Sequence, residues 1–215
     1  MRGRVLEQLA FSLPLATVAS FALTSLIIEL TPGPNMAYLA VVAASEGRRP
    51  GLATVAGVAL GLGLLGLAAA FGLAELISQS RLLYEVLRWA GVAFLLWLAV
   101  DSWRDSAAEE QPRDRSSLFY FRRGLVTNLL NPKAGLFFIT VLPAFIDPAR
   151  PILAQNIQLV VLYVLVATAI HTAIVLLAGA FEPVLTDPVR ERRVRRVLAA
   201  LLAAVAVWFG WSTGL

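Results

Sequence analysis

The stretch that decides the fold reads Ile27-Ile28-Glu29-Leu30-Thr31-Pro32-Gly33-Pro34-Asn35-Met36. It lies inside a run from Leu6 to Gly47 that contains no lysine or arginine. This run is longer than the roughly 20 residues that one straight helix needs to cross a bilayer core. Because neither Pro32 nor Pro34 has an N–H, and each disfavours the helical region for the residue before it, we expect two half-helices.

The break between these half-helices is predicted to be a functional site. We expect the first half-helix to end near Leu30 and the second to begin with Thr31 as its cap and Pro32 in its first position. Irregular backbone at membrane depth is tolerated only where protein or a water-filled cavity covers it. The carboxylate of Glu29 stands just before this irregular backbone, which suggests a binding or coupling role.

The composition indicates an integral membrane protein. Apolar residues make up 59% of the 215 residues and the mean hydropathy is +0.76, whereas soluble domains are about 45–50% apolar. The net charge of +4 rests on arginines between apolar segments, so we expect contacts with lipid head groups and none with nucleic acid. With no cysteine and one histidine, the sequence predicts neither a metal site nor a cofactor.

Six apolar segments are each long enough to span a membrane. They cover approximately residues 15–45, 51–77, 83–103, 124–146, 157–181 and 197–214. The polar stretch 104–121 is predicted to be a cytoplasmic linker between two halves, 1–103 and 122–215. We therefore expect one all-α transmembrane domain, residues 1–215, in which three spans per half give the two halves inverted topology.

The arginines predict the orientation. Twelve lie in the loops after the first, third and fifth segments, and five lie on the opposite side. By the positive-inside rule the first set is cytoplasmic and both termini are outside.

The second segment carries small residues at helical spacing, Gly57, Gly61, Gly63 and Gly66. Small residues four apart let two membrane helices approach closely. The pattern is compatible with a contact inside the chain and with a homodimer.

The fourth segment repeats the pattern of the first, because it contains Asn128-Leu129-Leu130-Asn131-Pro132-Lys133. Asn131 is a good helix cap and Pro132 suits the first helical position. Lys133 is the only lysine in the chain, and an ammonium at membrane depth needs a partner. We expect that partner to be Glu29, a carbonyl end of a helix or a substrate carboxylate. The alternative is that Pro132 only kinks the helix and Lys133 reaches the membrane surface.

Interrupted helices in matching positions of inverted halves are typical of a transporter's central binding site. The motifs also resemble a family. They are Thr31-Pro32-Gly33-Pro34-Asn35, then Gly47-Arg48-Arg49-Pro50-Gly51, then Gly124…Asn128…Asn131-Pro132-Lys133-Ala134…Phe137-Phe138. In order and spacing they resemble the LysE/RhtB family of amino-acid exporters over essentially the whole chain. The resemblance implies a six-helix exporter of amino acids or similar small metabolites in a bacterial-type inner membrane, driven by the proton motive force.

The candidate site residues follow from the two breaks. Free N–H groups at half-helix N-termini suit a substrate carboxylate. The proton carrier is expected to be Glu29, with His171 in the fifth segment as the alternative, because imidazole titrates near neutrality; His171 could instead only hydrogen-bond across helices. The predicted substrate-binding residues are Thr31, Pro32, Gly33, Pro34, Asn35, Asn128, Asn131, Pro132 and Lys133.

Two other classes of function remain open to test. A membrane enzyme is disfavoured because one histidine cannot supply a metalloprotease pair and no serine lies in a nucleophile-like turn. A non-transporting scaffold or assembly protein would fit the glycine-rich segment but leaves Glu29 and Lys133 without a role.

Overall fold

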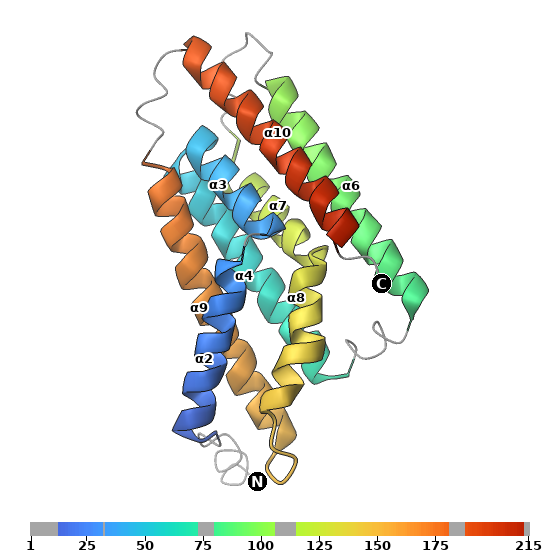
Figure 1. Cartoon of the computed structure of the whole chain (residues 1–215). Coiled ribbons are helices and arrows are strands. Elements are labelled where there is room, and N and C mark those ends of the chain that lie inside the picture. Colours follow the sequence, from blue (N-terminus) through green and yellow to red (C-terminus); the bar gives the residue numbers. More distant parts are fainter. Residues whose placement is uncertain (1–12, 32, 73–79, 106–114, 181–187, 213–215) are drawn as a thin grey trace.

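The computed structural model of the chain describes residues 13–31, 33–72, 80–105, 115–180 and 188–212, and every regular element within them is helical (Figure 1). In chain order the α-helices are α2 (Leu15–Leu30), α3 (Pro34–Glu46), α4 (Arg48–Ala70), α6 (Arg81–Asp105), α7 (Ser117–Leu129), α8 (Pro132–Leu136), α9 (Ile152–Ala178) and α10 (Pro188–Ser212). A π-helical turn, η1 (Phe137–Val141), and a 3-10 turn, η2 (Leu142–Phe145), continue α8.

Two of these helices, α4 and α9, are each long and apolar enough to cross a membrane. Two further units qualify only as bent pairs: α2 with α3 is bent by 62°, and α7 with Lys133–Phe145 is bent by 54°. The described residues thus hold two candidate spans, or up to four when each bent pair counts as one. An all-α membrane fold agrees with the prediction, whereas six spans in two inverted halves stay a prediction.

Several predicted segment boundaries differ from the helices. Helix α7 begins at Ser117, so the end of the predicted linker 104–121 is helical and the fourth segment begins before Gly124. Helices α9 and α10 also begin before the predicted 157 and 197, and α4 ends at Ala70 rather than near 77. Apolarity marks only the part of a helix suited to lipid, whereas helices continue into polar sequence. Residues 106–114 of the linker lie outside the described residues.

Helices α4 and α7 pack backbone against backbone. A Cβ added at Gly57 would overlap the carbonyl oxygen of Phe121, and one added at Gly124 would overlap the carbonyl oxygen of Thr54. Gly57, Gly61 and Gly66 of the second predicted segment thus make close contacts with residues of the other half of the chain, whereas Gly63 has no neighbour within 4 Å of an added Cβ. These contacts do not support the predicted homodimer, which stays a prediction.

An apolar core beside the site joins α2, η1 and α9. The ring of Phe137 stacks on that of Tyr163 with centroids 3.8 Å apart, and Phe21 meets Phe137 edge-on at 5.7 Å. Phe21 and Tyr163 are fully buried. Because close-packed rings have little room to move, this core fixes the direction in which the Tyr163 hydroxyl points.

Helices α6 and α10 form a second layer that runs obliquely across the rest of the molecule (Figure 1). Leu95, Leu98 and Leu202 are buried between these helices and α3. The outer face exposes about half or more of the side chains of Trp89, Trp97, Trp208 and Trp211. Such a surface suits contact with lipid.

Candidate functional site

The first break, residues 31–33 between α2 and α3, is extended on both sides of Pro32, which itself lies outside the described residues. Thr31 has ψ of 122°, Gly33 has φ of −163° and ψ of 177°, and Pro34 is the first residue of α3. The cap of α3 is therefore Gly33, and the expectation of Thr31 as cap with Pro32 in the first helical position is wrong. The cause is the second proline, because Pro34 keeps Gly33 out of the helical region.

The second break, residues 130–131 between α7 and α8, has the predicted cap. The Asn131 side chain accepts a hydrogen bond from the backbone N–H of Lys133 at 3.1 Å, and Pro132 is the first residue of α8. The Asn131 backbone N–H donates to the carbonyl of Asn128 at 3.0 Å. The prediction of Asn131 as the cap and Pro132 in the first helical position is confirmed.

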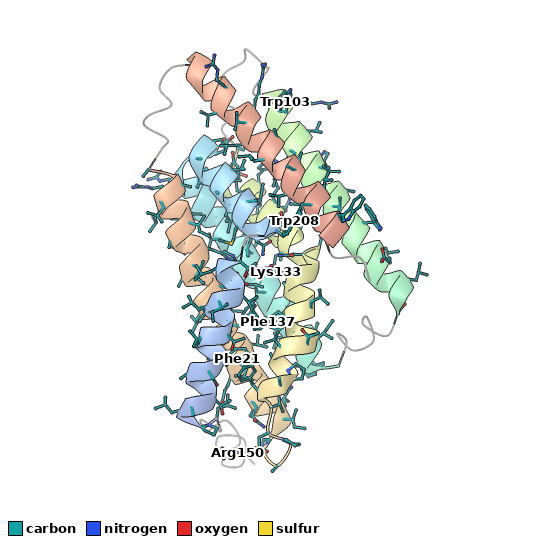
Figure 2. All side chains as sticks on the ribbon, in the orientation of Figure 1. Phe21, Trp103, Lys133, Phe137, Arg150 and Trp208 are labelled. Atoms are coloured by element: carbon teal, nitrogen blue, oxygen red, sulfur yellow. The ribbon has the colours of Figure 1, made fainter. Side chains whose placement is uncertain are left out.

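The two breaks meet in space. Lys133 Nζ donates hydrogen bonds to the carbonyl oxygens of Ile28 at 2.7 Å and Thr31 at 2.8 Å. Among the three partners expected for this lysine, the structure has the carbonyl end of a helix. Figure 2 shows Lys133 about midway between Trp103 near one end of the molecule and Arg150 near the other. The Lys133 ammonium thus turns toward the first break, and the alternative that it reaches the membrane surface lacks support from these contacts.

Asparagine side chains from both breaks also meet. Asn35 Nδ2 in the first turn of α3 donates to Asn128 Oδ1 in the last turn of α7 at 2.8 Å, and both side chains are buried. Asn35 Oδ1 and Asn128 Nδ2 are buried with no hydrogen-bond partner among the described residues. Unsatisfied buried polar atoms are unusual and point to a ligand or a functional role.

The carboxylate of Glu29 is buried with two polar partners from α9. The Tyr163 hydroxyl donates to Glu29 Oε1 at 2.5 Å, and His171 Nε2 lies 3.2 Å from Glu29 Oε2. Glu29 is 6% exposed and His171 is 1% exposed. A buried carboxylate persists only with hydrogen bonds or an opposite charge, and Tyr163 and His171 are the groups that contact Glu29 here.

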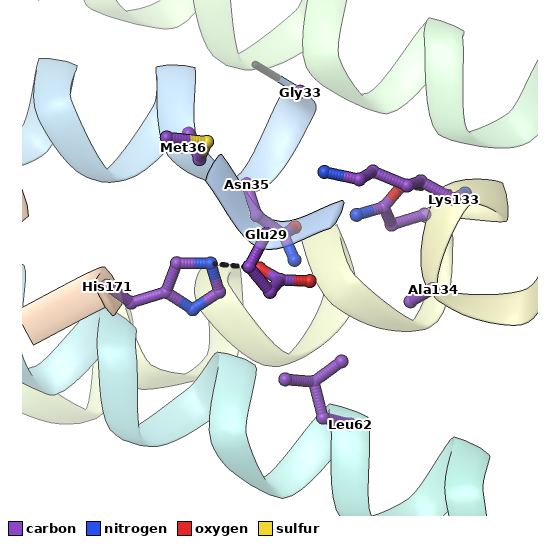
Figure 3. Close-up of a pocket in the computed structure, with 9 residues that line it drawn as sticks. Glu29, Gly33, Asn35, Met36, Leu62, Lys133, Ala134 and His171 are labelled. Carbon is purple, nitrogen blue, oxygen red and sulfur yellow. Dashed lines mark hydrogen bonds and ion pairs between the residues drawn. The ribbon is translucent and has the colours of Figure 1, made fainter. Parts of the chain in front are cut away.

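These groups surround one cavity, in which Figure 3 shows the Glu29 side chain between those of His171 and Lys133. Its volume of about 10 Å³ is close to the minimum for one water molecule. A molecule as large as an amino acid does not fit in a cavity of this volume. The lining residues are Glu29, Gly33, Asn35, Met36, Leu62, Asn131, Lys133, Ala134 and His171.

Most of the predicted site residues are thus brought together. Six of them line the cavity, namely Glu29, Gly33, Asn35, Asn131, Lys133 and His171. Pro34 and Asn128 are buried outside the lining, and Thr31 contributes its carbonyl to Lys133 while its side chain is exposed. Pro132 sets the start of α8.

Tyr163 is the functional candidate that sequence reasoning missed. It lies two turns before His171 on α9, with the small Ala167 between them, so one helix face carries both groups. That spacing is the only sequence signal for a role of Tyr163. It is weak because α9 is apolar around most of its circumference.

Comparison with known proteins assigns the chain. A family model described as LysE type translocator matches residues 26–213. The chain belongs to the LysE family. Members of that family are translocators, and the resemblance predicted from the Pro-Gly-Pro and Asn-Pro-Lys motifs is confirmed.

Named relatives of this LysE chain are efflux proteins. The homoserine/homoserine lactone efflux protein of Salmonella typhimurium is 31% identical over 191 residues, which cover 86% of this chain and 92% of that protein. The leucine efflux protein of Klebsiella pneumoniae is 29% identical over 168 residues, which cover 75% and 78%. No solved structure matches. The family description and these names are those of transporters, not enzymes.

Proposed function

We propose that this chain exports an amino acid or a closely related small metabolite across the inner membrane in exchange for protons. One observation carries the proposal: the only lysine of the chain and a buried glutamate, from opposite halves, line the same small cavity where two helix breaks meet. The LysE family and relatives named for homoserine and leucine efflux support it.

The cavity has groups of the kinds that recognise an amino-acid zwitterion. Lys133 supplies an ammonium for the substrate carboxylate, and Glu29 supplies a carboxylate. Asn35 and Asn131 add amide groups on the same lining. We assign the other described residues of the two breaks to holding these groups in position, namely Thr31, Gly33, Pro34, Asn128 and Pro132.

The transport cycle requires access from alternate sides. We assign one bent helix pair to each half, 1–103 and 122–215, as inverted repeats joined by a cytoplasmic linker at 104–121, with both termini outside. Rocking of one half against the other would open the cavity first to one side and then to the other. The α4–α7 contact between halves is the surface about which such a motion would occur.

Proton exchange is assigned to Glu29, with His171 as its neighbour. An exporter that works against a gradient needs a group that alternates between protonated and ionised forms, and intramembrane carboxylates recur in such relays. The two carboxylate oxygens of Glu29 face Tyr163 and His171. A substrate ammonium that arrives in the same cavity favours the ionised carboxylate, so substrate binding and proton release become linked.

The experiment that tests the function is transport by the purified protein in lipid vesicles. A thermal-shift screen of amino acids and related amines, with homoserine and leucine first, selects the candidate substrate. Radiolabelled substrate should then accumulate in vesicles when a pH gradient is imposed, and collapse of that gradient with an ionophore should abolish accumulation. Vesicles that show no exchange of any amino acid bound in the screen would contradict the proposal and favour the scaffold alternative.

A further inference from the structure

We propose that the carbonyl end of α2 is the binding site for the substrate's ammonium group, and that Lys133 Nζ fills it as an internal stand-in when no substrate is bound. The inference rests on the proposed function in taking the substrate to be an amino acid. It adds the place of ammonium recognition, the requirement for a free primary amine and a role for Lys133 as a reversible plug.

The Ile28 carbonyl lacks the donor that a continuous helix would give it, although the Thr31 N–H donates to it at 3.1 Å. In a continuous helix the carbonyl of Ile28 would accept from residue 32, which is a proline without an N–H. The carbonyl of Thr31 is turned out of the helical path because Thr31 is extended. The C-terminal end of a helix also carries a partial negative charge that attracts cations. The first break is therefore a ready acceptor site for a cation.

The structure contains a cation in that site. Lys133 Nζ bonds the carbonyls of Ile28 and Thr31 at 2.7 and 2.8 Å. A lysine ammonium and the ammonium of an amino acid have the same charge and three N–H donors. The two hydrogen bonds of Lys133 are thus the contacts that a substrate ammonium would make in this site.

A third acceptor lies on the same cavity. An ammonium has three N–H groups, of which Lys133 uses two on the printed carbonyls. Asn35 Oδ1 is buried, has no hydrogen-bond partner among the described residues, and belongs to a cavity-lining residue. We assign this oxygen as the third acceptor for a substrate ammonium, which Lys133 does not use.

The position of Lys133 allows its ammonium to leave this site. It reaches from α8 across to α2, it is only partly buried, and the side chain of Thr31 at its second acceptor is exposed. When a substrate ammonium takes the two carbonyls, the displaced Lys133 ammonium remains beside the cavity and can pair with the substrate carboxylate. The substrate zwitterion brings one positive and one negative charge, so the exchange leaves the net charge of the site unchanged. This matters because an unpaired charge is costly there.

The first measurement asks whether the site accepts a free amine. Lys133→Ala should bind n-propylammonium, which has the three carbons and the ammonium that the substitution removes, with a saturable rise in the thermal transition of roughly 5 °C. The wild-type chain should respond much less, because its own lysine competes. Propyltrimethylammonium has no N–H donor and should have no effect. Equal effects of the two amines, or no response of Lys133→Ala, would overturn the proposal.

A second variant covers the case in which Lys133→Ala does not fold. Lys133→Met keeps the side chain as far as the atom next to the ammonium and removes only the ammonium, so the ammonium ion is the probe that fits it. Its thermal transition should rise with ammonium and not with tetramethylammonium. The absence of this difference would count against the carbonyl site in the same way.

The second measurement separates a stand-in from a structural clamp. In Lys133→Ala, n-propylammonium should weaken binding of the amino acid selected by the wild-type screen, or leave it undetectable, because both ligands use the α2 carbonyls. A clamp predicts the reverse, namely that the amine restores amino-acid binding, and that result would overturn the inference. If the wild-type chain binds no amino acid at all, the proposed function fails while the amine measurements still decide whether this is an ammonium site.

Discussion

The Asn35 and Asn128 side chains join the two breaks through a buried hydrogen bond of 2.8 Å, from Nδ2 of the first to Oδ1 of the second. Asn35 follows the Pro-Gly-Pro motif and Asn128 precedes the Asn-Pro-Lys motif, 93 residues apart in the chain. The remaining amide atoms, Asn35 Oδ1 and Asn128 Nδ2, have no partner among the described residues. The bond therefore fixes the two breaks against each other and leaves polar atoms for a ligand.

Removal of either asparagine should destabilise the chain. Asn128→Ala leaves the Asn35 amide without its acceptor, at a cost of about 1–3 kcal/mol. In a double-mutant cycle with Asn35→Ala, followed by thermal unfolding in detergent, the two changes should couple by about 1 kcal/mol. Ser20→Ala, whose hydroxyl bonds only its own helix, is the control and should add to Asn35→Ala without coupling. Additive asparagine changes would show that the bond does not form.

The α4–α7 contact should be intolerant of a single methyl group. At Gly57 the added Cβ meets backbone of Phe121 and Leu125, which cannot move like a flexible side chain, so Gly57→Ala should cost about 1–3 kcal/mol. Gly63 lies on the same helix with nothing within 4 Å of an added Cβ. Gly63→Ala should be neutral or stabilise by up to about 1 kcal/mol. Equal thermal transitions for the two variants would contradict this packing.

Sequence alone predicted the parts of the site that depend on local backbone chemistry. Two X-Pro steps required a break near Thr31, and Asn131 before Pro132 was correctly predicted as a helix cap. The error at Thr31 is also local, because the restriction that Pro34 imposes on Gly33 delays the start of α3.

Contacts between distant residues were beyond the sequence. The cost of a buried ammonium required a partner for Lys133, but among three candidates only the structure identifies the carbonyls of Ile28 and Thr31. Nothing in the sequence around Tyr163 indicates its contact with Glu29, because a tyrosine in an apolar helix is equally suited to an apolar core. The glycines of α4 indicated close packing without naming α7 as the partner.

The charge and shape of Lys133 should both matter for export. Lys133→Ala removes a charge-assisted contact worth about 1.5–3 kcal/mol, which corresponds to roughly a 10- to 150-fold loss of substrate binding. Export should fall to background. Lys133→Arg should retain little activity, because a planar guanidinium differs in geometry and hydration from an ammonium. Uptake by vesicles with matched protein content measures both, and wild-type rates in both variants would make Lys133 structural only.

Loss of the Tyr163 hydroxyl should impair proton coupling more than it lowers the stability of the fold. Tyr163→Phe keeps the ring that stacks on Phe137 and removes the donor to Glu29 Oε1. Loss of a hydrogen bond to a charged group costs about 1.5–3 kcal/mol, so the thermal transition should fall modestly while the chain still folds. Gradient-driven accumulation should fall much more than substrate exchange between equilibrated vesicles. An equal loss of the two activities would limit Tyr163 to a packing role.

The central claim is that Glu29 carries the proton that drives export, and the Glu29→Gln variant tests it most directly. Glutamine keeps the shape of the side chain and cannot release a proton. In proteoliposomes loaded with substrate, Glu29→Gln should still exchange labelled for unlabelled amino acid, yet fail to concentrate it when a pH gradient is imposed. Glu85→Gln, which changes a carboxylate on α6 outside the cavity, should behave like the wild type. Full gradient-driven accumulation by Glu29→Gln would contradict the account and move proton coupling to His171.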